Sequence, residues 1–409
     1  MFKDFFSALL RFLRRGAGRL LRLEFGLFFR ETAAAARRVL LSLRAAAGGR
    51  RLRRELGRRV SGRRVIVFPP TLDWNAPLYQ RPQQLARAYS ETEGTLVVYL
   101  TANAGRDRVA VYERLSDTLW LVNAALAREL ARIIRGAGES IVSLSWTANL
   151  GYVSLLRPDR LIYEYIDELE IFDGFGEQMR RDHERLLREA DLTVCTAQRL
   201  YEAALPRARK AILSPNAGDY ALFSRTSEAE PDARIAAAAA GKRYTLGYYG
   251  ALAEWFDYEL IKRAAQSEPD WLFALIGMDY DGSLRRSGVC GLENVLWLPP
   301  VPYARLPSCL RSFDIALIPF VLNGVTLSTS PVKLFEYMAA EKPILAPRMP
   351  ECLKYACVAT YSEPEDFIAK AKELLSRKDE PELKAALRRD ALDNTWARRC
   401  GEILRALET

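Results

Sequence analysis

The chain has 409 residues, of which 49% are hydrophobic and 27% are charged. This length and composition predict two or three globular domains and exclude global disorder. The single histidine, His183, and six cysteines without a C-x-x-C pair argue against a zinc enzyme or a zinc finger. Unpaired, scattered cysteines are typical of proteins from a reducing compartment.

The net charge of +9 is unevenly distributed. Residues 1–64 contain 18 Lys and Arg against 4 Asp and Glu, whereas the rest of the chain contains 42 basic and 47 acidic side chains. A mildly acidic body therefore follows a strongly basic amino-terminal arm. This asymmetry concerns the partners of the protein rather than its fold.

Residues 1–60 are predicted to form a basic amphipathic helical arm, with Phe and Leu side chains opposite Lys and Arg. The arm contains no stretch of about 18 apolar residues, so no transmembrane helix is predicted. Asp4 and Arg11 argue against a secretory signal. We expect this arm to lie on an anionic membrane surface. Packing on the body or on a second copy is an alternative. A nucleic-acid arm is another, but no base-reading fold accompanies it, so we expect no nucleic-acid partner.

From Arg63 onward, apolar strands alternate with amphipathic helices, a pattern that predicts an α/β fold with parallel sheets. The predicted strands are Val65–Phe68, Thr95–Leu100, Thr118–Val122, Ser140–Leu144, Leu161–Ile166, Asp191–Cys195, Tyr244–Tyr249, Trp271–Ile276, Val295–Leu298, Ile315–Pro319 and Pro343–Ala346. The predicted helices lie near Gln83–Tyr89, Ala124–Arg135, Glu177–Glu189, Tyr258–Ala265, Pro331–Ala340 and Pro364–Leu375, with a long final helix near Glu380–Leu407.

This pattern predicts two Rossmann-like domains facing a cleft, residues 61–223 and 244–379. Residues 224–243 are expected to be a linker, and residues 380–409 a helix that returns to the first domain. Ligands in such sheets bind at the carboxyl ends of strands, beside helix amino termini. Neither domain contains a G-x-G-x-x-G or a G-x-x-x-x-G-K-[ST] sequence, which argues against a dinucleotide dehydrogenase and a P-loop kinase.

The segment Ser330–Ile344, SPVKLFEYMAAEKPI, resembles the donor-binding segment of bacterial GT-B glycosyltransferases of the retaining group-1, family-four-like type of surface polysaccharide biosynthesis. Further similarities follow in the expected order over roughly residues 64–400. They include Tyr248–Asp257, Leu275–Gly277, Pro302–Tyr303, Phe313–Pro319, Gln80–Gln83, Tyr165–Asp167 and Pro215–Asp219.

The resemblance implies a nucleotide-diphosphate sugar as donor, with no cofactor and no metal. Pro331 is expected to open a helix whose free amides face a diphosphate, and Lys333 to neutralise the departing charge. Glu336 stands three residues later, where the family's glutamate accepts hydrogen bonds from ribose hydroxyls. An ordinary ion pair between Lys333 and Glu336 is the alternative. The other expected donor-binding residues are Gly250, Ala251, Tyr303, Thr326, Ser328, Ser330 and Val332.

Two departures from the family pattern concern the sugar. The family's E-x7-E pair calls for an acidic residue eight positions before Glu336, and this chain has Ser328. The usual Arg and Lys near the first turn of the donor domain are replaced by Glu254, Trp255 and Asp257. These differences leave the transferred sugar open and allow an inactive site.

In the first domain, Asp167 and Arg81 are candidate catalytic residues. Asp167 ends a strand, where it can serve as a base in an inverting reaction. In a retaining reaction the departing phosphate takes the acceptor's proton, so Asp167 is not needed as a base. A third interpretation is that Asp167 caps a helix or belongs to a loop. Arg81 can reach the diphosphate or an anionic acceptor, or stabilise its own turn. His183 is expected on the surface, outside the chemistry.

We therefore expect a retaining glycosyltransferase that acts on an envelope polysaccharide or a lipid-linked acceptor. It would be a cytoplasmic enzyme held peripherally on the inner face of the membrane by residues 1–60. The alternatives are a GT-B sugar-nucleotide epimerase and an inactive GT-B module that scaffolds an assembly.

Overall fold

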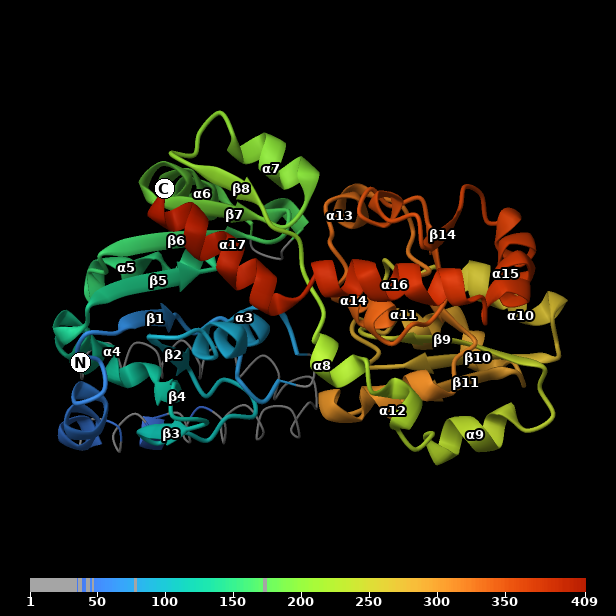
Figure 1. Cartoon of the computed structure of the whole chain (residues 1–409), viewed down its shortest axis with the longest axis horizontal. Helices are drawn as coiled ribbons and strands as arrows, with labels where there is room; N and C mark the ends of the chain where they lie inside the picture. The colour runs from blue at the N-terminus through green and yellow to red at the C-terminus, as the bar shows by residue number, and fades with distance from the viewer. Residues whose placement is uncertain (1–34, 36–38, 42–44, 46–47, 77–78, 172–174) are drawn as a thin grey trace, which may run out of the picture.

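The computed structural model describes residues 35, 39–41, 45, 48–76, 79–171 and 175–409. They form two α/β domains that lie side by side, each built around one sheet (Figure 1). Apolar residues such as Val97 and Phe273 are buried inside these sheets, as expected for parallel strands covered on both faces.

The first domain contains an eight-stranded sheet in the order β3-β4-β2-β1-β5-β6-β7-β8. All neighbouring strands are parallel except β3, which pairs antiparallel with β4. The strands are β1 (Arg64–Phe68), β2 (Thr95–Thr101), β3 (Tyr112–Arg114), β4 (Leu119–Asn123), β5 (Glu139–Leu144), β6 (Arg160–Tyr165), β7 (Leu192–Cys195) and β8 (Ala211–Leu213). The helices are α3 (Arg81–Ser90), α4 (Ala127–Ile133), α5 (Leu150–Leu156), α6 (Glu177–Glu189) and α7 (Gln198–Ala204).

The second domain contains a six-stranded parallel sheet in the order β11-β10-β9-β12-β13-β14. Its strands are β9 (Tyr244–Tyr249), β10 (Trp271–Ile276), β11 (Val295–Leu298), β12 (Ile315–Leu317), β13 (Ile344–Pro347) and β14 (Val358–Tyr361). Its helices are α8 (Tyr220–Phe223), α9 (Ala233–Ala239), α10 (Tyr258–Ser267), α11 (Ser283–Ser287), α12 (Leu306–Arg311), α13 (Gly324–Leu327), α14 (Val332–Ala339), α15 (Asp366–Arg377) and α16 (Pro381–Asp393).

Each sheet has one point where the strand order reverses. In the first sheet this point lies between β1 and β5, and in the second it lies between β9 and β12. Loops that leave the two strands at such a point diverge, which opens a crevice for ligands at the carboxyl ends of the strands. The two predicted Rossmann-like domains are confirmed, and each sheet has its own switch point.

The chain crosses between the domains twice, and the two crossings run side by side. Gly218 on the outward crossing bridges to Thr395 on the return, and the Gly218 amide donates to the Asn394 carbonyl at 3.0 Å. The predicted single final helix is two helices, because Asn394 leaves the helical conformation and Thr395 caps the next helix. Helix α16 packs on α14, whereas α17 (Trp396–Glu408) packs on α3 (Figure 1). Only α17 therefore returns to the first domain.

The predicted linker, residues 224–243, is folded against the second domain. Asp232 caps the first turn of α9 by accepting from the Arg234 amide, and the alanine run that follows is a good helix former. Ile235 of this helix is fully buried in the second core. The segment is therefore part of the second domain.

The last part of the predicted arm belongs to the first domain. Residues 48–57 are helical, and Leu52 and Leu56 are fully buried in the core of that domain. Arg53 pairs with Glu129 of α4. The predicted boundary at residue 60 therefore differs from the structure, and the amphipathic pattern of residues 2–13 lies outside the described residues. Within the described part of the chain, no helix has the length and apolar character needed to cross a membrane.

His183 is buried rather than on the surface. Its ring packs against Tyr163 and Tyr165, and Nδ1 lies 2.7 Å from the Tyr163 hydroxyl. Burial lowers the pKa of His183 to about 4. The expectation of a surface residue was wrong because His183 shares one face of α6 with the buried Leu186 and Leu187, three and four residues later.

Candidate functional site

Helix α14 begins between the two domains. Pro331 is its N-cap residue and has an extended backbone, and the free amides of the first turn follow it. Val332 packs against the hydrophobic cluster that contains α3 and α17 of the first domain. The helix therefore presents its positive end to the interdomain space, which suits an anionic group.

Lys333 lies in the first turn of α14, beside the loop that follows β9. Its ammonium group is 5.2 Å from the ring centre of Tyr248 and 4.9 Å from that of Phe320. Within the described residues, no carboxylate forms an ion pair with it. Burial lowers the pKa of Lys333 to about 8, while the charge of Glu336 raises it. A cation with aromatic neighbours and no ion pair is available to bind an anion.

The loop after β9 can approach Lys333 only because residue 250 is glycine. Gly250 has φ +143°, and a Cβ on it would lie 3.1 Å from Cε of Lys333 and 2.8 Å from the Tyr248 hydroxyl. Gly277 of the neighbouring loop is equally constrained, since its Cβ would lie 1.7 Å from the Gly250 carbonyl oxygen. The predicted donor-site residues Gly250 and Lys333 therefore lie together, and the Tyr248 hydroxyl donates to the Ala251 carbonyl at 2.7 Å.

Glu336 lies one turn further along α14 and is only 2% exposed. Tyr249 donates to its Oε2 at 2.5 Å, and Tyr303 donates to its Oε1 at 2.7 Å. Burial raises the pKa of Glu336 to about 7, against the lowering effect of the two hydroxyl donors and of Lys333. Tyr303 in turn accepts from the Gln84 amide of α3 at 2.7 Å. Each oxygen of Glu336 keeps a free lone pair, but the side chain is so deeply buried that a ligand hydroxyl reaches it only if a covering tyrosine moves.

Two serines that precede α14 are bonded to the first domain. The Ser328 hydroxyl donates to Oε1 of Glu168 at 2.9 Å, and the same oxygen lies 3.1 Å from Nε of Arg199. The Ser330 hydroxyl accepts from the Asn216 amide at 3.0 Å, and the Asn216 side chain donates to the Ser330 carbonyl at 2.6 Å. The segment that leads into α14 is therefore held against the first domain at two points.

Asp167 follows β6 at the same edge, next to Glu168. Burial raises the pKa of Asp167 to about 7. A carboxyl group that titrates near neutral pH can act as a general base or acid. Its neighbour Glu168 contacts the other domain, so Asp167 also lies close to the interdomain space.

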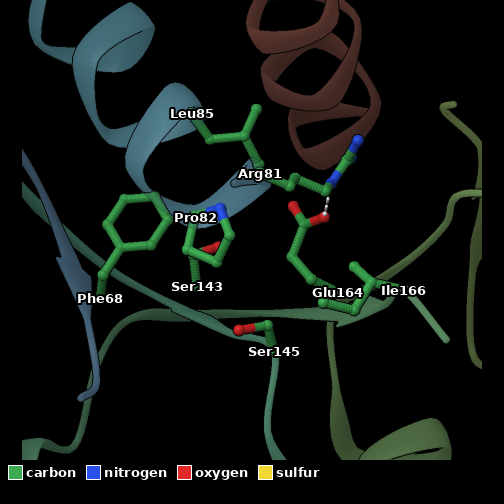
Figure 2. A pocket seen from close by; sticks show the side chains of 8 residues that line it. All are labelled: Phe68, Arg81, Pro82, Leu85, Ser143, Ser145, Glu164 and Ile166. Atoms are coloured by element: carbon green, nitrogen blue, oxygen red, sulfur yellow. Dashed lines mark hydrogen bonds and ion pairs between the residues drawn. The ribbon is translucent and has the colours of Figure 1, made fainter. Parts of the chain in front are cut away.

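Arg81 does not reach this space. Figure 2 shows it extending from the first turn of α3 to Glu164 on β6, with its Nε 2.8 Å from Oε2 of that carboxylate. The two side chains are 4% and 3% exposed. Arg81 also donates to the Pro215 carbonyl at 3.1 Å and stacks on Trp396. Arg81 therefore connects α3 to both crossings. These contacts correspond to the structural role considered for Arg81 in the sequence, not to a contact with the diphosphate.

The cavity beside Arg81 has a volume of about 10 Å³, which is room for about one water molecule. Arg81, Ser143 and Glu164 each contribute a buried polar atom that has no hydrogen-bond partner among the described residues. The lining residues are Phe68, Arg81, Pro82, Leu85, Ser143, Ser145, Glu164 and Ile166 (Figure 2). This cavity is too small for a sugar, so the candidate site is the interdomain space at α14.

Thr326 is another predicted site residue that is turned away. Its hydroxyl donates to the Val321 carbonyl at 2.6 Å and helps to cap α13 together with Asn323. Three residues that the sequence did not single out as site residues contribute instead. Tyr249, Gln84 and Asn216 make their contacts through hydrogen bonds to Glu336, Tyr303 and Ser330. No pattern in the sequence indicates these pairings.

Solved structures share this arrangement over nearly their full length. Sucrose-phosphate synthase from Thermosynechococcus elongatus superimposes with a TM-score of 0.63 over 84% of this chain and 99% of that one, at 15% identity. The chain has the GT-B fold. Another structure with the GT-B arrangement is Anabaena Alr3699/HepE in complex with UDP and glucose, with a TM-score of 0.58 and 14% identity over 85% of this chain and 99% of that one. The α,α-trehalose-phosphate synthase of Burkholderia xenovorans has a TM-score of 0.60 and 12% identity over 85% and 100%.

Residues 258–405 match the family described as "Glycosyl transferase-like", which places the match on the second GT-B domain and α17. A relative from Bacillus subtilis strain 168, "Putative teichuronic acid biosynthesis glycosyltransferase TuaH", is 28% identical over 262 residues. That alignment covers 59% of this chain and 65% of the relative, slightly less than two thirds of its length. These matches confirm the predicted resemblance to GT-B glycosyltransferases of bacterial surface polysaccharide biosynthesis.

Proposed function

We propose that this chain transfers a sugar from a nucleoside diphosphate sugar to a surface polysaccharide or its lipid-linked precursor. The observation that carries the proposal is the position of α14, whose amino end lies at the contact between the domains, with Lys333 beside Gly250. The relative from Bacillus subtilis is named as a teichuronic acid biosynthesis glycosyltransferase, which supports a polysaccharide acceptor.

The amino end of α14 and the ammonium group of Lys333 would bind the pyrophosphate and stabilise the charge that develops as the sugar leaves. Glu336 would accept hydrogen bonds from the ribose after displacing a tyrosine hydroxyl. These residues supply the positive charge themselves, and we propose that the reaction requires no cofactor and no metal.

We propose retention of the anomeric configuration, with the departing phosphate oxygen taking the acceptor's proton. Asp167, with a pKa of about 7, is the base available to an inverting reaction. NMR of the first-formed product distinguishes the two, since an inverted linkage together with loss of turnover in Asp167→Asn would assign Asp167 as the base.

We further propose that residues 1–60 attract the enzyme to the anionic inner face of the membrane, where a lipid-linked acceptor lies. The surplus of 18 basic over 4 acidic residues in positions 1–64 supports this placement.

Binding of UDP-, GDP-, TDP- and ADP-sugars, measured by calorimetry, tests the proposal. Micromolar to millimolar binding of one of them, followed by release of its nucleoside diphosphate in the presence of an acceptor, is expected. Binding of none would favour the alternative of an inactive scaffold. Ser328, which stands where the family pattern has an acidic residue, would then be a sign of lost activity.

A further inference from the structure

Glu168 is the acidic side chain that crosses the interdomain space at the entrance to α14. It belongs to the first domain, immediately after β6, yet its Oε1 accepts from the Ser328 hydroxyl of the second domain at 2.9 Å. Ser328 is 1% exposed, so its hydroxyl has little access to water and points to this carboxylate. The carboxylate therefore lies directly against the segment that ends in the proposed pyrophosphate site.

The position of Glu168 is fixed from its own domain. Arg199 of α7 approaches the same oxygen at 3.1 Å, and the Glu168 side chain is 23% exposed. A partly exposed carboxylate that is oriented by one arginine keeps acceptor capacity, because each oxygen has two lone pairs. Oε1 is used twice, and no hydrogen bond to Oε2 is recorded among the described residues.

We propose that Glu168 accepts hydrogen bonds from the hydroxyls of the transferred sugar, so that the first domain helps to select the donor. This inference rests on the proposed function. The sugar is bonded to the distal phosphate, and a phosphate bound at Pro331–Lys333 would bring the sugar to the segment that contains Ser328, three residues before Pro331. A ring rich in hydroxyl donors needs acceptors there, and a charged acceptor forms stronger hydrogen bonds than a neutral one.

The residue acts by binding rather than by chemistry, since Ser328 and Arg199 both hold its carboxylate in place. Glu168 also faces the donor only when the domains lie as they do in this structure. Recognition of the sugar then depends on the domain arrangement of this structure, because moving the domains apart would separate Glu168 from Ser328.

The experiment compares each nucleoside diphosphate with its own sugar derivative in the full chain. Calorimetry gives the gain in affinity that the sugar adds to the nucleotide. The ligands are UDP, UDP-glucose, UDP-galactose, UDP-glucuronate, UDP-N-acetylglucosamine, GDP, GDP-mannose, TDP and TDP-glucose. In Glu168→Gln this gain is expected to fall about tenfold or more, as for loss of a charged hydrogen bond, while affinity for the free nucleotide changes less than twofold.

Two variants separate sugar binding from a purely structural link. Ser328→Ala removes the cross-domain hydrogen bond but leaves Glu168 with Arg199, and it is expected to lower the gain less than Glu168→Gln does. Glu202→Gln, an exposed carboxylate on α7, is the matched control and is expected to behave as wild type. Equal weakening of nucleotide and sugar nucleotide in both Glu168→Gln and Ser328→Ala would overturn the proposal in favour of a domain latch.

The remaining outcomes are equally distinct. A wild-type protein that binds a nucleoside diphosphate but gains nothing from any sugar overturns the role of Glu168 alone. A wild-type protein that binds no nucleotide overturns the proposed function instead. An unchanged gain in Glu168→Gln also contradicts the assignment of this residue.

Discussion

At the scale of single residues, the start of α14 at Pro331 was predicted and the surroundings of Glu336 were not. The helix start follows from proline's preference for that position, a local property of the sequence, whereas the roles of Lys333 and Glu336 come from the family resemblance and stay predictions. The hydroxyls that cover Glu336 come from Tyr249 and Tyr303, which are 87 and 33 residues away. Such pairs depend on packing between distant segments, and a single sequence contains no local signal for them.

Lys333 makes nucleotide binding dependent on pH. Its pKa in the free protein is about 8, and a bound diphosphate favours the charged form. Affinity for UDP, or for whichever nucleoside diphosphate binds, is therefore expected to fall by up to tenfold per unit above pH 8, because the free protein loses the proton that the complex retains. The terminal phosphate is already fully ionised at pH 8, since the second pKa of a phosphate monoester is about 6.

Calorimetry between pH 6.5 and 10 measures this dependence. In Lys333→Arg the guanidinium stays charged throughout this range, so its affinity is expected to stay constant above pH 8. A wild-type profile that is equally flat would show that Lys333 does not contact the diphosphate.

Arg81 is predicted to be a stabilising residue. Arg81→Met leaves the carboxylate of Glu164 buried without its partner, which is expected to cost about 3–5 kcal/mol in the unfolding of the first domain. Urea denaturation followed by tryptophan fluorescence measures the loss. Arg87→Met on the same helix is the control, because Arg87 is exposed and its distance to Asp219 is 4.0 Å, so a change below about 1 kcal/mol is expected. Wild-type stability in Arg81→Met would return Arg81 to the list of candidate ligands.

At the scale of elements, strands with uninterrupted apolar runs were predicted well. Strands β9 (Tyr244–Tyr249), β10 and β11 have the predicted bounds. Edge strands β3 and β14 were not predicted because polar residues interrupt them, and β8 was not predicted because it has only three residues. The linker and the long final helix were wrong for a related reason. An alanine run favours a helix without indicating its packing, and a break at Asn394 has no proline or glycine to mark it.

Gly218 couples the outward crossing to α14. A Cβ at this position would lie 2.9 Å from the carbonyl carbon and oxygen of Phe335, and neither backbone segment can move independently of its domain. Gly218→Ala is therefore expected to destabilise the protein by about 1–3 kcal/mol and to weaken nucleoside diphosphate binding by displacing α14. Thermal denaturation and calorimetry measure the two effects.

Gly151→Ala is the matched control for this prediction. Gly151 lies in α5, and nothing is within 4 Å of the position of its Cβ. Because alanine favours a helix over glycine, the control is expected to have equal or higher stability. Equal melting temperatures for Gly218→Ala and wild type would contradict the close contact with α14.

At the scale of the whole molecule, the two-domain GT-B architecture followed from the alternation of strands and helices together with the Ser330–Ile344 segment. The sequence did not indicate where the arm ends and the first domain begins, because basic residues such as Arg53 form ion pairs within that domain. Residues 48–60 have the composition of a surface arm and the packing of a core helix. Composition alone does not separate these two uses of Leu and Arg.

The membrane proposal is tested by two deletions. Removal of residues 1–34 is expected to weaken binding to vesicles that contain phosphatidylglycerol while leaving the melting temperature unchanged. It removes the amphipathic pattern of residues 2–13 but keeps the 11 basic and 1 acidic residues of positions 35–64. Binding by the full chain should weaken at high salt. Removal of residues 1–60 is expected to destabilise the first domain as well, because it takes away the buried Leu52 and Leu56. Vesicle sedimentation and thermal denaturation measure both. Undiminished vesicle binding by the shorter deletion would place the anchor elsewhere.

The paired crossings have a consequence for synthesis on the ribosome. Because the chain leaves the first domain near Gly218 and returns at Thr395, the second domain is inserted within the first. Trp396, Ile403 and Leu404 complete a hydrophobic cluster around α3, and they are translated after the whole second domain. The apolar face of α3 in the nascent first domain therefore stays uncovered until α17 has been made, whereas the inserted domain can fold earlier. Premature termination after residue 393 would leave a finished inserted domain attached to an incomplete, aggregation-prone host.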